Sequence, residues 1–395
     1  MPDAPSALPQ WHLLQASDVL DLELAAALTD SVPLTAWQPK HTFLLWIAKI
    51  TDLHNPHYPT VRIKQFPLLR GYARPPLSAI ARTGSTLTAM LLKQTPDPRN
   101  SPLICTVPYF ASVAECWPGP VIYWLTDLIT EYTSARGIDI PALDRRMCRA
   151  ATLVCPNSER LAGYLTRKAA CDPEKIHILP NATRTTNLLP APPQSPADLP
   201  PDLQHLRRPI AGVIGNLAGN MDWLLLQGMI EQTEHLSWVF VGPTAMPIPD
   251  PAQAAARAAV LAHPATHFVG KKPYGDLARY ARAFDVAVLP YLRGEPTYSG
   301  SSTRFYEHLA ASRPMLATSG LEELTRKVPL LRLIATVPDG VAGLQHLQNI
   351  RFDDGLTHAR WAASQVGTWH TRAQSMQDAL ALRLPLKQPG PAHSQ

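Results

Sequence analysis

Residues 286–318, which read VAVLPYLRGEPTYSGSSTRFYEHLAASRPMLAT, decide how the rest of the chain is interpreted. The apolar run 286–290 predicts a buried strand, which a loop containing glycine and proline then ends. Residues 301–303 (Ser-Ser-Thr) are N-cap residue types, and they predict a helix that ends near Ser312. The apolar run 314–318 predicts the next strand. A strand, a long loop, a helix and a strand in this order indicate an open α/β sheet, where ligands bind in loops at the carboxyl ends of the strands.

The predicted helix carries an unusual pair of charges. Arg304 falls in its first turn, where the helix dipole disfavours a cation and the free backbone N–H groups favour an anion. An anion such as a phosphate, bound between Arg304 and the helix start, would explain this placement. Glu307 lies on the same face, one turn or about 5.4 Å further on, roughly the distance from the diphosphate of a sugar-nucleotide to its ribose hydroxyls. An exposed Arg–Glu pair on an ordinary helix is the alternative.

Length and charge restrict the class of protein. The chain has 395 residues, of which 46% are hydrophobic and 17% are charged, so two domains with large cores are expected. The formal net charge is +5, and the basic residues form no single run, which argues against a nucleic-acid partner. A mildly basic chain suits anionic ligands or an anionic membrane surface, and an ordinary soluble protein is the alternative.

No cofactor and no metal site are predicted. The five cysteines include no C-x-x-C pair, so neither a zinc site nor a disulfide framework is expected, and a reducing cytosol is the default. The first residues lack the features of a signal peptide, and no run of about 18 apolar residues occurs. We therefore expect a cytoplasmic protein. Residues 42–50 (TFLLWIAKI) would place it on the inner face of the membrane if they form an interfacial patch, and burial of this segment is the alternative.

Strands and helices alternate along both halves of the chain, which is typical of parallel α/β sheets. Between the halves, residues 186–208 are rich in proline and lack periodicity, which predicts a linker. The sequence therefore predicts two Rossmann-like domains that face a cleft, over residues 1–185 and 209–365. Residues 366–395 predict a helix and a loose tail.

The loop at residues 215–219 (GNLAG) lies between a predicted strand and a predicted helix. Its candidate ligand-binding residues are Gly215, Asn216 and Gly219, because glycine lets the backbone approach a phosphate or a sugar closely. The loop matches neither G-x-G-x-x-G nor the P-loop pattern, which argues against a dinucleotide-binding fingerprint and a P-loop NTPase. A tight turn without a ligand is the alternative.

Two further strand ends carry candidate site residues. Lys271, Lys272 and Tyr274 follow a predicted strand of the second half, where they would contact phosphate or line a nucleobase pocket; solvated surface lysines are the alternative. In the first half, Asp127 follows the predicted strand 121–125 and is a candidate catalytic base or substrate-hydroxyl ligand, with a helix N-cap as the alternative. The glycine loop, the lysine loop and the helix start would share the carboxyl edge of one sheet.

Several segments together resemble the glycosyltransferases of the GT-B fold, in particular the large retaining group called family 4, or glycosyl transferases group 1. The segments are ATLVCPNSERLAGYL (151–165), KIHILPNATR (175–184), PIAGVIGNLAGNMDWLLL (209–226), HFVGKKPYGDLARYARAFDVAVLPY (267–291), SGSSTRFYEHLAASRPMLAT (299–318) and WAASQVGTWHTRAQSM (361–376). The last of them is similar to the closing helix that, in the family, crosses back to the first domain.

The resemblance implies roles for the candidate residues of the second domain. Glu307 would hold the ribose of a nucleotide-sugar donor. Arg304 and the N–H groups near Ser301 and Ser302 would face the diphosphate, and residues 215–219 would let the phosphates or the sugar approach.

The resemblance also implies where the other groups would lie. Residues 272–274 would lie near the nucleobase, and the acceptor would bind to the first domain near Asp127. No protein nucleophile and no metal are needed for retaining transfer of this kind, so catalysis would depend on positioning and on stabilising the leaving diphosphate.

The chain departs from the family pattern at the donor site. Ser299 stands where the family often has a first glutamate, and Asn220 and Met221 stand where a lysine often follows the glycine loop. The expected activity is transfer of a sugar from a nucleotide-sugar to a glycan or lipid-linked acceptor, in cell-surface polysaccharide or glycoconjugate synthesis. The alternatives are a catalytically inactive partner protein that binds nucleotide or glycan, and a nucleotide-sugar epimerase.

Overall fold

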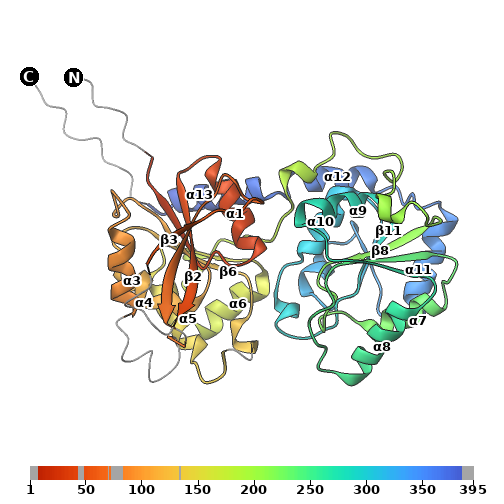
Figure 1. The fold of residues 1–395 in the computed structure, drawn as a ribbon, viewed down its shortest axis with the longest axis horizontal. Helices are drawn as coiled ribbons and strands as arrows, with labels where there is room; N and C mark the ends of the chain where they lie inside the picture. Colours follow the sequence, from red (N-terminus) through yellow and green to blue (C-terminus); the bar gives the residue numbers. More distant parts are fainter. Residues whose placement is uncertain (1–7, 43–48, 70, 73–82, 133–134, 385–395) are drawn as a thin grey trace, which may run out of the picture. The chain divides into compact units, whose positions relative to one another are not determined.

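The computed structural model describes residues 8–42, 49–69, 71–72, 83–132 and 135–384, and these form two units (Figure 1). The first unit runs to Leu179 and includes the chain again from Arg372 onward, and the second unit runs from Pro180 to Thr371. Residues 43–48 of the predicted interfacial patch lie outside the described residues. No helix in the described ranges is long and apolar enough to cross a bilayer.

The first unit contains a seven-stranded sheet in the order β3-β4-β2-β1-β5-β6-β7. All neighbouring strands are parallel except β3, which is antiparallel to β4 at the edge. Without β3, the six parallel strands have the Rossmann order, which reverses between β1 and β5. The strands are β1 (Trp11–Leu14), β2 (Leu34–Thr42), β3 (Thr51–Leu53), β4 (Arg62–Leu69), β5 (Leu103–Cys105), β6 (Val121–Leu125) and β7 (Leu153–Pro156).

Helices bury the faces of the first sheet, which explains why β6 (VIYWL) is apolar at every position. Residues of α3 to α6 share one apolar cluster with the strands. The helices are α1 (Val19–Thr29), α3 (Thr83–Leu92), α4 (Ala111–Cys116), α5 (Ile140–Ala150), α6 (Glu159–Lys168) and α13 (Trp369–Ala381). In α13, the Gln377 side chain donates a 2.7 Å hydrogen bond to the Ser31 hydroxyl just beyond α1. The prediction that the C-terminal helix returns to the first domain is therefore confirmed.

The second unit contains a six-stranded parallel sheet in the order β10-β9-β8-β11-β12-β13. This is again the Rossmann order, and it reverses between β8 and β11, the point at whose carboxyl edge open α/β sheets bind their ligands. The strands are β8 (Ile210–Ile214), β9 (Ser237–Val241), β10 (Thr266–Gly270), β11 (Val286–Leu289), β12 (Met315–Ala317) and β13 (Arg332–Leu333).

Two layers of helices cover the second sheet. In Figure 1, α9, α10 and α12 lie on one side of the sheet and α7, α8 and α11 on the other, and the two sets contribute to different apolar clusters. The helices are α7 (Trp223–Glu231), α8 (Pro251–Ala262), α9 (Leu277–Ala283), α10 (Thr303–Ala311), α11 (Val337–Asn349) and α12 (Thr357–Gln365). The predicted start of α10 is confirmed: the Ser302 hydroxyl accepts the Phe305 N–H at 3.0 Å.

The proline-rich residues 186–208, which we predicted to be a linker, lie within the second unit. Leu203 and Leu206 are buried there in a cluster with Ile210 and Tyr280. Apolar residues spaced between the prolines therefore pack against the sheet although the segment is not periodic.

Residues 176–179 lie beside β7. Ile176 forms a bridge to Val154, and the His177 and Leu179 N–H groups donate to the Val154 and Pro156 carbonyls, both at 2.9 Å. Helices α12 and α13 follow one another closely near the end of the described residues. Between them, Thr183 donates to the Gly367 carbonyl and accepts from the Trp369 N–H, so this stretch of backbone pairs with another segment.

We expect Gly212→Ala to destabilise the second unit. Gly212 lies in β8, and a Cβ there would collide with the Phe284 ring. The free energy of unfolding in urea should fall by about 1–3 kcal/mol. Gly294→Ala is the control, since a Cβ at Gly294 meets no atom within 4 Å. Equal stability of the two variants would contradict close packing at Gly212.

Candidate functional site

The candidate site is the carboxyl edge of the second sheet at β8 and β11, where the strand order reverses. Two backbone hydrogen bonds hold the loops that follow these strands together. Leu292 donates to the Asn220 carbonyl at 2.9 Å, and Asp222 donates to the Pro290 carbonyl at 2.7 Å. The loop at residues 215–219 therefore faces the loop after β11, as its position at the carboxyl edge predicts.

Two glycines make room in this crevice. Gly215 and Gly242 follow β8 and β9 with φ values of +124° and +151°, in the region that favours glycine. A Cβ on Gly215 would collide with the Arg304 side chain, and a Cβ on Gly242 would collide with the Gly215 carbonyl. Because Gly215 has no side chain, the Arg304 side chain can pass over this loop.

Arg304 is a buried cation, 8% exposed, in the first turn of α10. Its Nη2 donates to the Asn216 carbonyl at 2.7 Å, and its Cζ lies 4.8 Å from the centroid of the Tyr291 ring. Its Nη1 has no hydrogen-bond partner, and no carboxylate among the described residues forms an ion pair with it. A buried charge is costly unless it is paired, so this arrangement favours an anionic ligand.

His308, one turn after Arg304, adds no second positive charge to the helix. It is buried, and burial lowers its pKa to about 3, with the Arg304 charge adding to the effect. The imidazole is therefore neutral at physiological pH and places no second cation beside Arg304.

Glu307 is buried at 3% exposure and accepts hydrogen bonds from three side chains. The Tyr274 hydroxyl donates to Oε1 at 2.6 Å, while the Thr183 hydroxyl and the Asn187 amide donate to Oε2 at 3.1 Å and 2.9 Å. Because Arg304 and Glu307 are both buried and each is bonded elsewhere, the alternative of an exposed Arg–Glu pair is wrong.

A second carboxylate, Glu323, occupies the start of α10. Its Oε2 accepts from the Ser302 N–H and the Ser301 hydroxyl, both at 2.9 Å. Its Oε1 accepts from the Tyr306 hydroxyl at 2.8 Å and lies 3.1 Å from Lys327 Nζ. The chain therefore supplies its own anion at this helix start, a contact that the sequence reading missed because Glu323 lies about twenty residues further along the chain.

The two lysines of the loop at residues 271–274 lie in different environments. Lys272 Nζ pairs with Asp202 at 2.7 Å and lies 5.6 Å from the centroid of the Tyr280 ring, whereas Lys271 is exposed. Tyr274 reaches Glu307, and the Arg184 guanidinium lies 4.9 Å from the centroid of its ring. The loop is therefore joined to α10 through Tyr274 rather than through either lysine.

Asp127 follows β6 at the carboxyl edge of the first sheet. Burial raises the pKa of its carboxyl group to about 6, a hydrogen bond with Tyr132 opposes the rise, and the charge of Asp18 adds to it. The short 3₁₀ turn that follows (Ile129–Glu131) has Leu128 as its N-cap. Asp127 is therefore not the helix cap of the alternative reading.

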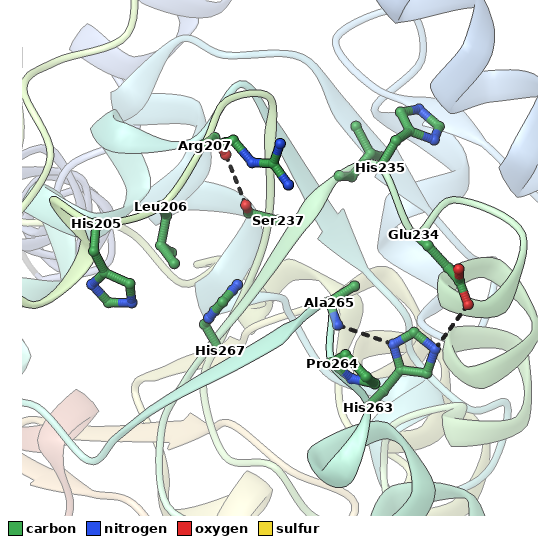
Figure 2. A pocket seen from close by; sticks show the side chains of 11 residues that line it. His205, Leu206, Arg207, Glu234, His235, Ser237, His263, Pro264, Ala265 and His267 are labelled. Carbon is green, nitrogen blue, oxygen red and sulfur yellow. Dashed lines mark hydrogen bonds and ion pairs between the residues drawn. The ribbon is translucent and has the colours of Figure 1, made fainter.

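A cavity of about 390 Å³ lies at the opposite, amino edge of the second sheet. Figure 2 shows His205 and His267 on one side of it and His263, paired with Glu234 at 3.5 Å, on the other. No group of three or more metal-ligating side chains occurs in the described part of the chain. The cavity lies before the first residues of β9 and β10, away from the strand ends where Arg304 lies.

Comparison with protein-family models and with curated proteins gives no match. The fold is similar to that of a sucrose-phosphate synthase from Thermosynechococcus elongatus, which is 15% identical with a TM-score of 0.64 over 95% of this chain and 98% of that one. HepE from Anabaena in complex with UDP-glucose is 12% identical, with a TM-score of 0.65 over 95% of this chain and 100% of that one. A glycosyltransferase from Rickettsia africae ESF-5 is 10% identical, with a TM-score of 0.67 over 97% and 100%. The fold is therefore GT-B, as predicted.

We expect Asp127→Asn to make stability less dependent on pH. The folded-state pKa lies above the ordinary value of 3.8, so the wild-type protein loses stability as the pH rises from about 4 to about 6. The variant should match the wild type near pH 4 and exceed its free energy of unfolding by about 1–3 kcal/mol at pH 7. Urea unfolding across this range measures the difference.

The control for this measurement is Asp52→Asn, at an exposed position in β3. It should follow the wild type throughout. A parallel shift of Asp127→Asn at every pH would mean that the Asp127 charge is not destabilising.

Proposed function

We propose that the protein is a glycosyltransferase that moves a sugar from a nucleotide-sugar to a glycan or lipid-linked acceptor. The observation that carries the proposal is Arg304, a buried cation without a carboxylate partner, at the strand-order reversal of a Rossmann-like unit. Such a crevice binds nucleotides, and a buried guanidinium binds a diphosphate well. The similar structures include a sucrose-phosphate synthase and HepE with UDP-glucose.

In this proposal the leaving diphosphate binds at Arg304. Nη1 donates to a phosphate oxygen, while Nη2 stays on the Asn216 carbonyl and holds the guanidinium in place. Gly215 and Gly219 keep the loop free of side chains where the phosphates approach. A fixed positive charge in a dry crevice stabilises the negative charge that develops on the diphosphate as the sugar leaves.

Glu307 and Tyr274 form the proposed nucleoside side of the site. Oε2 of Glu307 stays with Thr183 and Asn187, and Oε1 exchanges its Tyr274 partner for a ribose hydroxyl. Tyr274, released from Glu307, then lies beside the base together with the two lysines of its loop.

Ser301 and Ser302 have an indirect part in this proposal. Because Glu323 already accepts from both residues, the diphosphate lies on the Arg304 side of the helix start. A phosphate placed at Ser302 would meet the Glu323 carboxylate, and like charges at close distance repel.

We place the acceptor on the first unit, near Asp127. A carboxyl group with a pKa of about 6 is suited to take up the proton of an acceptor hydroxyl near neutral pH. A retaining transferase of cell-surface polysaccharide or glycoconjugate synthesis, acting in the cytoplasm at the inner face of the membrane, is the form of the proposal that we favour.

A non-catalytic nucleotide-binding protein is the second candidate, because Ser299 stands where the resembling family often has a glutamate. One contact counts against it. The Glu295 carboxylate, four residues earlier, accepts from the Ser299 hydroxyl at 2.8 Å and from its N–H at 3.1 Å. A carboxylate therefore lies beside this position although the residue is serine.

A panel of UDP-, GDP- and dTDP-sugars tests the proposal. We expect at least one donor to bind in calorimetry, and mass spectrometry to detect a glycosylated product with a suitable acceptor. Binding without transfer or donor hydrolysis across a broad acceptor panel would favour the second candidate. A changed sugar without any acceptor would indicate epimerisation. Binding of no nucleotide would contradict both candidates.

Arg304→Gln should weaken nucleoside diphosphate binding about 10- to 100-fold, because a charge-assisted hydrogen bond contributes about 1.5–3 kcal/mol. Titration calorimetry with the preferred diphosphate measures the effect. Arg279→Gln, at an exposed position in α9, is the matched control and should bind like the wild type. Equal affinities for the two variants would remove Arg304 from the site.

Glu307→Gln separates the ribose from the phosphates. The amide keeps the shape of the side chain but loses the charge that attracts hydroxyl donors, so the affinity for UDP should fall about tenfold. Inorganic pyrophosphate should bind to this variant as it binds to the wild type. A similar loss for both ligands would mean that Glu307 shapes the whole crevice and does not contact the ribose.

A further inference from the structure

The cavity at the amino edge of the second sheet has no part in the proposed sugar transfer. It has a volume of about 390 Å³, and four histidines line it: His205, His235, His263 and His267. Figure 2 shows His205 and His267 together on one side of the cavity. Arg304 lies at the opposite, carboxyl edge of the same sheet, so the cavity is a second place at which this unit could hold a ligand.

Two of the four histidines are engaged with other groups of the chain. The Nε2 atom of His235 lies 2.9 Å from the side-chain oxygen of Gln348, at hydrogen-bonding distance. In His263, Nδ1 accepts the Ala265 N–H at 3.2 Å, and Nε2 lies 3.5 Å from a carboxylate oxygen of Glu234. One nitrogen of the His235 ring and both nitrogens of the His263 ring therefore have partners within the unit.

The other two histidines face each other. The ring centroids of His205 and His267 are 5.9 Å apart, and the ring planes meet at 79°. Neither ring hydrogen-bonds to another residue in the described part of the chain. Burial lowers the pKa of His267, and the charge of a protonated His205 would lower it further, so His267 is neutral at pH 7. A neutral imidazole has one nitrogen that can accept a proton or a metal ion.

The backbone positions of both histidines are fixed by one apolar cluster. His267 lies directly opposite Val239 in the ladder of β10 and β9, so the two side chains are on the same face of the sheet. Val239 is buried in a cluster with Leu203 and Leu206. His205 lies between these two leucines in the chain. The packing of the leucines on the sheet therefore places the His205 ring beside the His267 ring.

The separation of the two rings suits a single metal ion. A transition-metal ion binds an imidazole nitrogen at about 2.0–2.1 Å, so the ion lies about 3.2 Å from the centroid of the ring. One ion can therefore bind two imidazoles whose centroids are up to about 6.4 Å apart. The observed distance of 5.9 Å is within this limit. The His205 side chain is exposed, so its ring can turn to present either nitrogen.

The charges around the cavity are compatible with a cation. Helix α8 ends at Ala262, next to His263 in the lining, and the carbonyl groups at the C-terminal end of a helix attract positive charge. The Glu234 carboxylate also lines the cavity. Arg207 contributes a positive charge to the lining, but in Figure 2 its guanidinium points away from His205.

We propose that His205 and His267 bind one divalent transition-metal ion, with water molecules completing its coordination. Imidazole ligands suit Cu²⁺, Ni²⁺ and Zn²⁺, and sites with nitrogen ligands bind Cu²⁺ most tightly of the three. The two ligands are far apart in the sequence, which explains why no local motif indicates the site. Ion binding does not depend on the proposed sugar transfer, because the pair lies at the other edge of the sheet from Arg304.

The experiment uses the full chain without a histidine tag, after removal of metal with EDTA. The protein is titrated with CuCl₂ and with ZnCl₂ in a calorimeter at about pH 7, where neutral imidazole is available. We expect one saturable site per chain, with a higher affinity for Cu²⁺ than for Zn²⁺. Pulsed electron paramagnetic resonance of the Cu²⁺ complex should detect two coordinated imidazoles. The absence of a saturable site for both ions would overturn the proposal.

Single substitutions identify the ligands. His205→Asn and His267→Asn should each lower the Cu²⁺ affinity by about tenfold or more, because one imidazole alone cannot chelate the ion. The resonance spectrum of each variant should then show one coordinated imidazole. His235→Asn is the matched control, since His235 lines the same cavity but is bonded to Gln348, and it should bind Cu²⁺ like the wild type.

The fold of the variants is checked by urea unfolding. His205 is exposed, so His205→Asn should unfold at the same urea concentration as the wild type, and a lost site then means a lost ligand. Wild-type affinity in His205→Asn would overturn the proposal. Equal losses of affinity in His205→Asn and His235→Asn would also overturn it, because the ion would then bind elsewhere in the cavity.

Discussion

The second unit is organised around a positive charge that its own side chains do not neutralise. Arg304 is buried, and burying an ion costs several kcal/mol unless a partner compensates it. The protein provides one carbonyl, that of Asn216, and the face of the Tyr291 ring. Gly215 is required because any side chain there would collide with the guanidinium. Gly215 in the loop after β8, the start of α10 and the order of the strands therefore together place the Arg304 guanidinium.

Two buried carboxylates bond at α10: Glu307 lies within the helix, and Glu323, from the 3₁₀ turn Glu322–Arg326, bonds at its start. Glu307 and Glu323 each accept hydrogen bonds from three or more groups of the same unit. Neither carboxylate forms an ion pair with Arg304, although both are buried. The unit therefore holds these two buried carboxylates with its own side chains and backbone, whereas one nitrogen of the Arg304 guanidinium stays without a partner.

Much of this could be predicted from the sequence, because apolar runs and cap residues are local signals. The bounds of α10 follow from Ser302 and Ser312, and the parallel α/β class follows from the alternation of strands with helices. Contacts between distant residues could not be predicted in this way. The Glu323 carboxylate at the start of α10 and the Asp202 partner of Lys272 have no local signal. Helix α11 was missed because Pro338, Gly340 and Gly343 interrupt its helical pattern.

At two positions where the sequence departs from the family pattern, a charged residue from elsewhere in the chain lies nearby in space. No lysine follows the glycine loop, yet Arg304 reaches back from α10 to the Asn216 carbonyl within that loop. Position 299 is a serine, yet the 3₁₀ turn at Thr297–Ser299 brings the Glu295 carboxylate onto it. In both cases a charged group from another residue lies beside the position that departs from the pattern. Charges from distant residues can therefore meet at one place without a local sequence motif.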